Sequence, residues 1–487
     1  MRILNIFHVA SECVPFAKTG GLADVVGSLP AALSKLGHKV CVALPAYRGT
    51  LSKIEKSSKK YSIRGKNEDL AVEGTVYEHE SDTGITFYLF ENKEYFYRDY
   101  LYGTPESDYP DNLDRFMFFC KAFLEFLPTL SFKPDVLHCH DWQTSLIPLY
   151  LKSIYAGNNF YNSIRSVYTI HNLGYQGLFP ATEFPKLGIP DSYYSIDGIE
   201  FYHKINLMKG GIFYSDKITT VSKKYSKEIQ TIEYGCGLEG VLNVRKNDII
   251  GIVNGIDYSL WNPAKDKFLA AKFSEKNISG KQECKQALLE RFGLPVNLQT
   301  PIIAMISRLA DQKGFDILMD VFDKLMELDI FFVLLGTGDK KYHDLFEKLS
   351  KQYKNRTGIM IAFDNALAHQ IEAGADMFLM PSQYEPCGLN QLISLKYGTI
   401  PIVRGTGGLD DTILDYSENQ SRGNGFKFFE YSGKSLLDKV VSAIDVYNDR
   451  ESWITLQKRA MKQDFSWKTA AKQYIELYSQ LTCGLIE

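Results

Sequence analysis

The sequence predicts an α/β protein made of two doubly wound domains, each a parallel sheet with helices on both faces. The first observation is a series of short apolar runs that alternate with helical stretches: ILNIFHVA, KVCVALPAY, ITFYLFE, PDVLHCHD, RSVYTIHN, DKITTVS and DIIGIVNG. Apolar runs of this length are typical of parallel strands that are buried on both faces. The second observation is that the alternation restarts after residue 300, with PIIAMISRL, IFFVLLGTG, GIMIAF, DMFLMPS and TIPIVRG. Two Rossmann-like domains follow from this repetition.

The segments between and after these runs define the domain boundaries. The stretch from NGIDYSLW to KQECKQ is polar and lacks the strand pattern, which predicts a linker near residues 255–265. The final stretch, DFSWKTAAKQYIELYSQL, has apolar residues at helical spacing and predicts an amphipathic helix. The charged stretch 52–69 predicts a solvated connection within the first domain.

Composition and charge exclude several classes of protein. The 487 residues are 45% hydrophobic and 23% charged, as in an ordinary soluble globular protein. A net charge of -3 gives no electrostatic basis for binding nucleic acid or an anionic membrane. The eight cysteines are scattered without a C-x-x-C pair, which predicts buried thiols in a reducing compartment. Because the first ten residues lack the parts of a signal peptide, we expect a cytoplasmic protein without a membrane partner.

The stretch VPFAKTGGLADVVGSLP follows the first predicted strand and opens a predicted helix. Gly20 and Gly21 permit a tight turn and a close approach of backbone N–H groups, and the N-terminus of the helix favours an anion at the same place. Lys18 adds a mobile positive charge. The pattern is neither a P-loop nor a dinucleotide fingerprint, so we expect a seat for phosphate or sugar hydroxyls. The alternative is a glycine turn without a ligand.

The sequence HCHDWQTSLIP, residues 138–148, ends another predicted strand. His138, Cys139, His140 and Asp141 invite a metal site, but alternate residues of a strand point to opposite faces. No second ligand pair with zinc spacing is present elsewhere in the sequence, so we expect no metal. Asp141 is expected to cap a helix or to line a polar pocket.

His171 and Asn172 end the next predicted strand, in YTIHNLGYQG. The two glycines that follow let the backbone bend back toward a ligand. The alternative for His171 is a structural histidine whose hydrogen bonds are satisfied within the fold.

In the second half, SRLADQKGFD places Arg308 and Lys313 five residues apart at the end of a strand. Two cations in this position are unsuited to a core and suit a pyrophosphate, which they would hold through charge-assisted hydrogen bonds. The alternative is a solvated surface turn.

Two further motifs lie at strand ends in the second half. In PSQYEPCGLNQ, Glu385 precedes Gly388, where a helix is expected to begin, and its carboxylate suits sugar hydroxyls. The alternative for Glu385 is a favourable interaction with the helix dipole. The stretch VRGTGGLDDT repeats the strand, glycine pair and helix of the opening motif. An anion seat in each domain predicts a ligand held in a cleft between the domains.

Together these motifs resemble, in order and spacing, the bacterial glycogen synthases and plant starch synthases. The motifs that carry the resemblance are KTGGLADVVGSLP, HCHDWQ, YTIHNLGYQG, VNGID, SRLADQKGFD, PSQYEPCGLNQ, GTGGLDDT and FSW, and they extend from residue 1 to about residue 480. The resemblance implies a GT-B glycosyltransferase with an acceptor domain of residues 1–258 that is completed by a crossover helix, 468–487. Residues 259–467 would bind the nucleotide sugar. The implied reaction moves glucose from ADP-glucose to the 4-hydroxyl at the non-reducing end of an α-1,4-glucan such as glycogen. It retains the anomeric configuration and uses no metal or cofactor.

The resemblance also implies residue roles. Arg308 and Lys313 would stabilise the leaving diphosphate, Glu385 would orient the donor glucose, and His171 would place its main-chain carbonyl near the reacting centre. Further residues would bind substrate: Lys18, Gly21, Asp141, Asn172, Asn254, Phe363, Cys387, Gly388, Thr406 and Gly407. Phe363 stands where the family presents an aromatic ring, often tyrosine, to the adenine. Tyr100 and Tyr102 are candidates for the acceptor groove.

One position departs from part of the family, and two other functions stay open. Some relatives carry a second glutamate eight residues after the first, where this chain has Ile393, so a mechanism that needs that carboxylate does not apply. The resemblance therefore favours direct attack on the face from which the diphosphate leaves. A glucan phosphorylase would share the fold but needs a lysine that binds pyridoxal phosphate. A non-catalytic glucan-binding protein would be expected to have lost some of the five residues Lys18, His171, Arg308, Lys313 and Glu385. No motif by itself distinguishes ADP-glucose from UDP-glucose.

Overall fold

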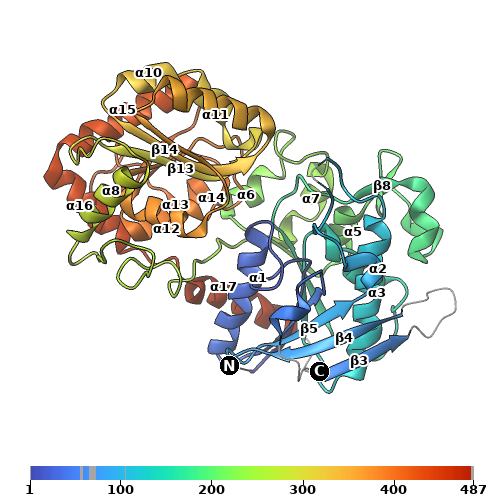
Figure 1. The fold of residues 1–487 in the computed structure, drawn as a ribbon. Coiled ribbons are helices and arrows are strands. Elements are labelled where there is room, and N and C mark those ends of the chain that lie inside the picture. Colours follow the sequence, from blue (N-terminus) through green and yellow to red (C-terminus); the bar gives the residue numbers. More distant parts are fainter. Residues whose placement is uncertain (1, 55–58, 65–72, 105, 484–487) are drawn as a thin grey trace. The chain divides into compact units, whose positions relative to one another are not determined.

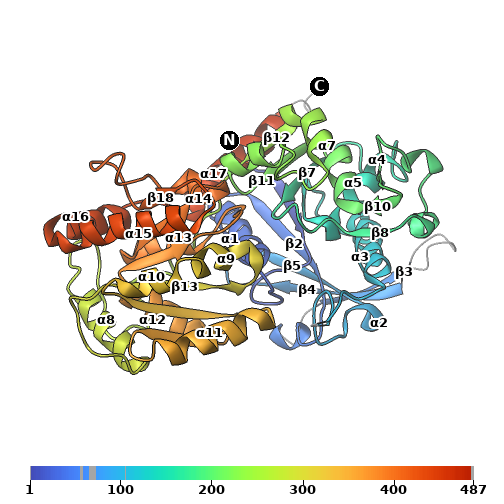
Figure 2. The same cartoon turned by 90° about the horizontal axis from the view of Figure 1, so that it is seen from above.

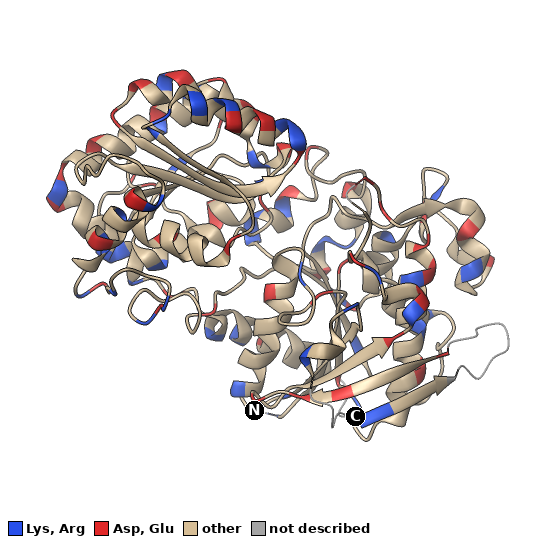
Figure 3. Cartoon of the chain, in the orientation of Figure 1, with Lys and Arg blue, Asp and Glu red and all other residues tan. Residues whose placement is uncertain are grey.

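The computed structural model describes residues 2–54, 59–64, 73–104 and 106–483, and the chain divides into two compact units (Figure 1). Unit 1 comprises Met1–Gly255 and Trp467–Glu487, and unit 2 comprises Ile256–Ser466. The boundaries predicted from the sequence lie after residues 258 and 467. Within the described residues, no helix combines the length and the hydropathy that crossing a membrane requires. Figure 3 shows acidic and basic residues interspersed on both units.

Unit 1 is built on a sheet of nine strands in the order β12-β11-β7-β6-β1-β2-β5-β4-β3. Seven are parallel, and β4 and β3 add to one edge in antiparallel pairing. The strands are β1 (Asn5–Val9), β2 (Lys39–Pro45), β3 (Lys59–Arg64), β4 (Glu73–Glu80), β5 (Thr86–Glu91), β6 (Val136–His140), β7 (Arg165–Ile170), β11 (Lys217–Thr220) and β12 (Ile249–Gly251). A small antiparallel sheet consists of β8 (Leu178–Pro180), β9 (Glu200–Phe201) and β10 (Lys204–Asn206).

The helices of unit 1 follow the predicted alternation. They are α1 (Gly21–Lys35), α2 (Lys93–Phe96), α3 (Asn112–Phe126), α4 (Leu146–Lys152), α5 (Leu207–Tyr214), α6 (Lys223–Glu228), α7 (Glu239–Val244) and α17 (Trp467–Thr482). One expectation was wrong: the charged stretch 52–69 was expected to be a solvated connection, but residues 59–64 of it pair with β4 as the edge strand β3. An edge strand tolerates charged residues because one of its sides faces solvent. Residues 55–58 and 65–69 of that stretch lie outside the described residues.

The C-terminal helix α17 belongs to unit 1. Trp467, Ala471, Tyr474 and Tyr478 recur at helical spacing and are buried in one apolar cluster with Leu29 of α1 and strand residues of the sheet. Both Figure 1 and Figure 2 draw α17 beside α1. The amphipathic pattern therefore fixes α17 on the first half of the chain. Residues 484–487 of the predicted helix lie outside the described residues.

Unit 2 has a six-stranded, all-parallel sheet in the order β15-β14-β13-β16-β17-β18. The strands are β13 (Ile302–Leu309), β14 (Phe331–Gly338), β15 (Thr357–Ile361), β16 (Met377–Met380), β17 (Ile400–Arg404) and β18 (Phe426–Phe428). The helices are α8 (Gly280–Arg291), α9 (Phe315–Met319), α10 (Phe322–Glu327), α11 (Lys340–Gln352), α12 (Asn365–Gly374), α13 (Asn390–Tyr397), α14 (Gly407–Thr412), α15 (Gly433–Asn448) and α16 (Arg450–Met461).

The strand order of each sheet reverses at one point. In unit 1 the reversal lies between β1 and β6, and in unit 2 it lies between β13 and β16. Loops at the carboxyl ends of such neighbouring strands diverge to opposite faces of the sheet and leave a crevice in which ligands of doubly wound folds bind. The residues that follow β1, β6, β13 and β16 are therefore the candidates for a ligand site.

Candidate active site

The predicted residues of unit 1 follow the carboxyl ends of its parallel strands. Lys18 and Gly21 come after β1, Asp141 directly after β6, His171 directly after β7, and Asn254 after β12. The loops of β1 and β6 flank the point where the strand order reverses. The residues that the sequence pattern predicted therefore all lie at the same edge of the sheet, the carboxyl edge.

The glycine loop after β1 is held by Glu12, a residue that the sequence reasoning missed. Glu12 is 3% exposed, and its carboxylate accepts the N–H of Thr19 at 2.5 Å and that of Gly20 at 3.2 Å. The Thr19 hydroxyl donates to it at 2.5 Å and the Tyr102 hydroxyl at 2.7 Å. The N–H groups of Thr19 and Gly20 are therefore occupied by a carboxylate of the protein itself. The only sign of this role in the sequence is that an acidic residue follows closely after an apolar strand.

Lys18 is not the mobile charge that the sequence suggested. Its ammonium group donates to both carboxylate oxygens of Asp24, in the first turn of α1, at 2.7 and 2.8 Å. Burial raises the pKa of Asp24, and the Lys18 charge opposes that rise. The side chain of Lys18 is 43% exposed, so it remains within reach of an anion from solvent.

Asp141 combines an unusual backbone with a buried carboxylate. Its φ of 55° and ψ of -178° lie in a region that is essentially restricted to glycine. The carboxylate accepts the backbone N–H of His171 at 2.7 Å, and burial raises the Asp141 pKa to about 7. The expected role as a helix cap was wrong, because its side chain caps no N–H of the short helix that follows. Asp141 instead fixes the main chain of His171.

Three histidines lie closer together than the sequence suggested. His138 and His140 are two residues apart on β6, so they share one face, and His8 on β1 joins them with ligand atoms within 4.8 Å of one another. Separation on opposite faces was therefore the wrong reason to set a metal aside. Both ring nitrogens of His140 are hydrogen-bonded to other histidines, and those of His138 to Tyr478 and Thr169. Their lone pairs and hydrogens are thus used within the fold, and a metal would have to displace these partners.

The two predicted asparagines differ in how their side chains are used. Asn172 accepts the N–H of Gly174 at 3.0 Å, which makes it part of a local turn. Asn254 is 5% exposed, and its side-chain oxygen is buried without a hydrogen-bond partner among the described residues. A buried acceptor without a partner costs free energy, so Asn254 is the one of the two that a ligand hydroxyl would satisfy.

Unit 2 brings the predicted cation and carboxylate into direct contact. Lys313, after β13, donates to the Glu385 carboxylate, after β16, at 2.6 Å, and the Ser382 hydroxyl donates to the same oxygen at 3.0 Å. Arg308, the penultimate residue of β13, is exposed and donates to the Gln312 side chain at 3.5 Å. Gln312 donates in turn to the Tyr384 carbonyl at 3.0 Å. The loops that flank the reversal point of this sheet are thus joined by polar contacts.

The glycines of the GTGG turn serve close packing of two backbones. A side chain at Gly407 (φ 46°) would lie 2.0 Å from the Glu385 carbonyl oxygen, and one at Gly408 would lie 2.0 Å from that of Cys387. The N–H of Gly408 donates to the carbonyls of Glu385 and Pro386, both at 3.1 Å. The turn therefore seats the Glu385 loop, and Thr406 within it is 1% exposed. Cys387 is buried as well.

Phe363 and Ile393 lie in opposite environments. Phe363 follows β15 and is 84% exposed, which leaves its ring free to stack on a flat ligand. Ile393 is 5% exposed and packs in an apolar cluster with Leu392, Tyr397 and Met461. Of the two candidate acceptor tyrosines, Tyr100 is 52% exposed, whereas the Tyr102 hydroxyl is bound to Glu12.

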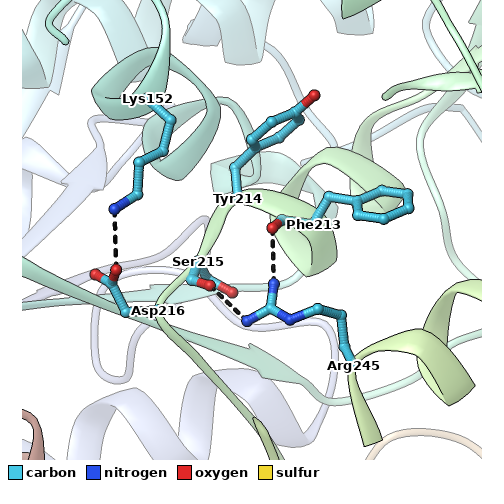
Figure 4. Close-up of a pocket in the computed structure, with 6 residues that line it drawn as sticks. All are labelled: Lys152, Phe213, Tyr214, Ser215, Asp216 and Arg245. Carbon is cyan, nitrogen blue, oxygen red and sulfur yellow. Dashed lines mark hydrogen bonds and ion pairs between the residues drawn. The ribbon is translucent and has the colours of Figure 1, made fainter. Parts of the chain in front are cut away.

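A cavity of about 470 Å³ in unit 1 does not coincide with these residues (Figure 4). Its lining residues are Lys152, Phe213, Tyr214, Ser215, Asp216 and Arg245. Lys152 donates to Asp216 at 2.9 Å, and Arg245 donates to the carbonyls of Phe213 and Ser215 at 2.7 and 2.8 Å. Ser215 and Asp216 precede β11, so the cavity lies at the amino end of that strand, and ligands of such sheets bind at the carboxyl ends.

Both halves of the chain match known protein families. Residues 5–244 match the starch synthase catalytic domain, and residues 288–459 match the glycosyl transferases of group 1. The chain is 50% identical over 477 residues to a glycogen synthase of Koribacter versatilis, with 98% of both chains covered. It is 46% identical over 481 residues to a glycogen synthase of Geotalea daltonii, again with 98% of both covered.

Solved structures give the same result. The catalytic domain of starch synthase IV from Arabidopsis thaliana, bound to ADP and acarbose, has a TM-score of 0.90 and 34% identity, over 99% of this chain and 100% of that one. A sucrose-phosphate synthase from Thermosynechococcus elongatus has a TM-score of 0.63 and 15% identity, over 98% of this chain and 99% of that one, which shows a shared fold alone.

Proposed function

The chain belongs to the glycogen and starch synthase family of GT-B hexosyltransferases, and on that premise we propose that it transfers glucose from ADP-glucose to the 4-hydroxyl at the non-reducing end of an α-1,4-glucan, glycogen. The anomeric configuration is retained. The observation that carries the proposal is the contact between Lys313 and Glu385, 2.6 Å apart at the point where the strand order of unit 2 reverses. The starch synthase IV neighbour was solved with ADP and acarbose, which supports an adenine nucleotide and a glucan as ligands here.

Charge stabilisation is the main contribution of unit 2. When the bond between glucose and diphosphate breaks, the sugar acquires oxocarbenium character and the diphosphate gains negative charge. Arg308 and Lys313 are cations fixed beside the place where that charge develops, so they stabilise the transition state more than the bound substrate. Substitution of either by alanine is expected to lower kcat much more than it raises KM. An unchanged kcat in either variant would refute this role.

Orientation of the donor depends on groups from several strands. The Glu385 carboxylate, held by Lys313 and Ser382, accepts hydrogen bonds from hydroxyls of the glucose. Asp141 holds the main chain of His171, whose carbonyl lies beside the reacting carbon in the proposed complex. Phe363 stacks on the adenine, and the phosphates contact the segments of Gly388 and Gly407. Lys18, Gly21, Asn172 and Asn254 contribute further polar contacts.

The proposed mechanism is direct attack by the glucan hydroxyl on the face from which the diphosphate leaves. A double displacement needs a carboxylate placed as a nucleophile. At the position where some relatives carry their second glutamate, this chain has the buried Ile393. The proposed reaction uses no metal and no organic cofactor, and it involves neither nucleic acid nor a membrane. A cytoplasmic location is supported by the eight unpaired cysteines.

The test measures transfer of labelled glucose to glycogen from ADP-glucose and from UDP-glucose in parallel, with EDTA present and, for comparison, without it. We expect rapid incorporation from ADP-glucose alone, in linkages that an enzyme specific for α-1,4 bonds releases. Incorporation that stops in EDTA would refute metal independence, and a preference for UDP-glucose would refute the donor assignment. Folded protein that binds glycogen but incorporates nothing would favour a glucan-binding protein. A bound pyridoxal absorbance band would favour a phosphorylase.

A further inference from the structure

Three histidine rings form a hydrogen-bonded row that starts in the core of unit 1 and ends at the carboxyl edge of its sheet. His8 Nδ1 on β1 lies 3.0 Å from His140 Nε2 on β6, and His140 Nδ1 lies 3.0 Å from His171 Nε2, directly after β7. His8 and His140 are 0% exposed, whereas His171 is half-buried. We call His8, His140 and His171 the imidazole row. Its outer end is the residue that the proposed function places beside the donor glucose.

The rings of the row meet edge to edge. The centroids of His8 and His140 are 5.3 Å apart with 18° between the ring planes, and those of His140 and His171 are 5.3 Å apart with 34°. The facing nitrogens are 3.0 Å apart in both contacts, so a nitrogen of each ring points at a nitrogen of the next. His138 supports the middle ring, because it stacks on His140 at 4.2 Å and is itself held by the Tyr478 hydroxyl at 2.6 Å. The row is thus fixed in orientation by its surroundings.

Hydrogen bonding allows only two arrangements of protons in the row. Burial lowers the pKa of His8 and of His171 to about 3, and that of His140 well below its ordinary value, so the three rings are neutral at pH 7. A neutral imidazole has one donor nitrogen and one acceptor nitrogen. Both hydrogen bonds can form only if all three rings carry their proton on Nδ1 or all three carry it on Nε2. The tautomer of His171 is therefore coupled to that of His8.

The inner end of the row selects between these arrangements. His8 Nε2 is buried without a hydrogen-bond partner among the described residues. An orphaned N–H donor is the rarer kind of unsatisfied buried group. The favoured arrangement leaves this nitrogen without hydrogen, with the proton of His8 on Nδ1. His8 then donates to His140, His140 donates to His171, and His171 carries its proton on Nδ1.

We propose that His8 and His140 are positioning residues that hold the His171 ring with an N–H donor at Nδ1, where it donates a hydrogen bond to an oxygen of the donor sugar. No described residue accepts a hydrogen bond from His171 Nδ1, so the proton is available to a ligand. The contact to sugar rests on the proposed function, whereas the coupled tautomers do not.

The first experiment needs no substitution in the row. Protonated and bare ring nitrogens have well-separated ¹⁵N shifts, so protein labelled at its nine histidines reports each tautomer, with each ring assigned by correlation to the backbone signals of its own residue. We expect His8, His140 and His171 all to carry the proton on Nδ1 at pH 7. A mixture of tautomers within the row, or Nε2–H at His171, would overturn the proposal. The spectrum requires no substrate, so it tests the row even if the proposed transferase reaction fails.

The second experiment compares His8→Met with His8→Phe. Both substitutions are apolar, but the methionine sulfur is a weak acceptor. It can accept from His140 Nε2–H and so reverse the row, whereas phenylalanine offers no acceptor and leaves His171 with Nδ1–H. We expect His8→Met to shift His171 to Nε2–H and to have a kcat roughly tenfold below that of His8→Phe, with KM changed less than about twofold, as loss of one hydrogen bond to the sugar predicts.

A buried histidine outside the row supplies the control. His38 is 6% exposed and accepts the Leu4 N–H at 3.2 Å. His38→Phe should lower stability but leave the ¹⁵N signals of His171 and kcat at wild-type values. Equal kcat and equal His171 spectra in the two His8 variants would show that position 8 acts through packing alone. If neither His8 variant folds, the wild-type spectrum still decides.

Discussion

Substitution of Lys313 by methionine separates the stabilising and the catalytic roles of the Lys313–Glu385 pair. The two side chains are 18% and 10% exposed, their charged atoms are 2.6 Å apart, and the Ser382 hydroxyl also donates to Glu385. Breaking a fully buried pair costs about 3–5 kcal/mol, because one charge stays buried without its partner, and an exposed pair is worth at most about 1 kcal/mol. The intermediate burial here predicts a loss of about 2–3 kcal/mol in the free energy of unfolding.

The activity of the same variant should fall much further than its stability explains. Removal of one group that stabilises developing negative charge costs roughly 10²–10³ in kcat. The double variant Lys313→Met with Glu385→Gln no longer contains a buried charge, so it should recover about half of the lost stability. It should recover none of the lost kcat. Urea unfolding gives the stability, and initial rates of glucose transfer give kcat and KM.

Lys439 provides a matched control in the same unit. Its ammonium lies 2.8 Å from the Asp415 carboxylate, and the side chains are 18% and 4% exposed. Lys439→Met should lose about as much stability as Lys313→Met, since the two pairs are buried to a similar degree. Its kcat should stay within about twofold of wild type. Equal losses of kcat in both lysine variants would refute the reasoning, because general destabilisation would then explain the effect.

Three other substitutions test single features. Glu12→Gln replaces a carboxylate, which only accepts hydrogen bonds, by an amide whose NH₂ group would point hydrogens at the N–H groups of Thr19 and Gly20. In initial-rate measurements kcat/KM for ADP-glucose should therefore fall about tenfold. Phe363→Ala removes an 84% exposed ring, so KM for ADP-glucose should rise about tenfold while the unfolding free energy changes by less than about 0.5 kcal/mol. The pKa of Asp141 in the folded chain is about 7, above its ordinary value. Between pH 4 and 7 the folded chain therefore keeps a proton that the unfolded chain releases, so the free energy of unfolding falls as pH rises. The unfolding free energy of wild type minus that of Asp141→Asn should therefore drop by up to about 4 kcal/mol across this range, and a flat difference would contradict the raised pKa.

The positions of the site residues could be predicted from the sequence because they depend on strand ends. Arg308, His171 and Asp141 each stand at the end of an apolar run, and the carboxyl ends of parallel strands meet at one edge of a sheet. The alternation of strands and helices is therefore sufficient to predict that such residues lie at the same edge of the sheet. For the same reason the glycine pairs at residues 20–21 and 407–408 could be located at the starts of helices α1 and α14.

What those residues contact could not be predicted in the same way. The glycine pairs suggested two anion seats, yet Gly20 donates to Glu12 and Gly408 donates to the Glu385 loop. Both patterns are compatible with a turn that binds phosphate and with a turn that binds a neighbouring segment. The choice depends on a side chain or carbonyl from another strand, and the local sequence carries no information about it.

The histidines show how strand register decides chemistry that the local sequence leaves open. His8 stands alone in an apolar run, and its register partner His138 follows 130 positions later. A shift of one residue in the pairing of β1 with β6 would turn His8 to the opposite face of the sheet. His8 could then no longer contact His140, and the imidazole row would not form. A lone histidine in a core strand is therefore informative only together with the strand that pairs beside it. The proposed state of the His171 ring is accordingly a property of the sheet as a whole, although it acts at a single nitrogen.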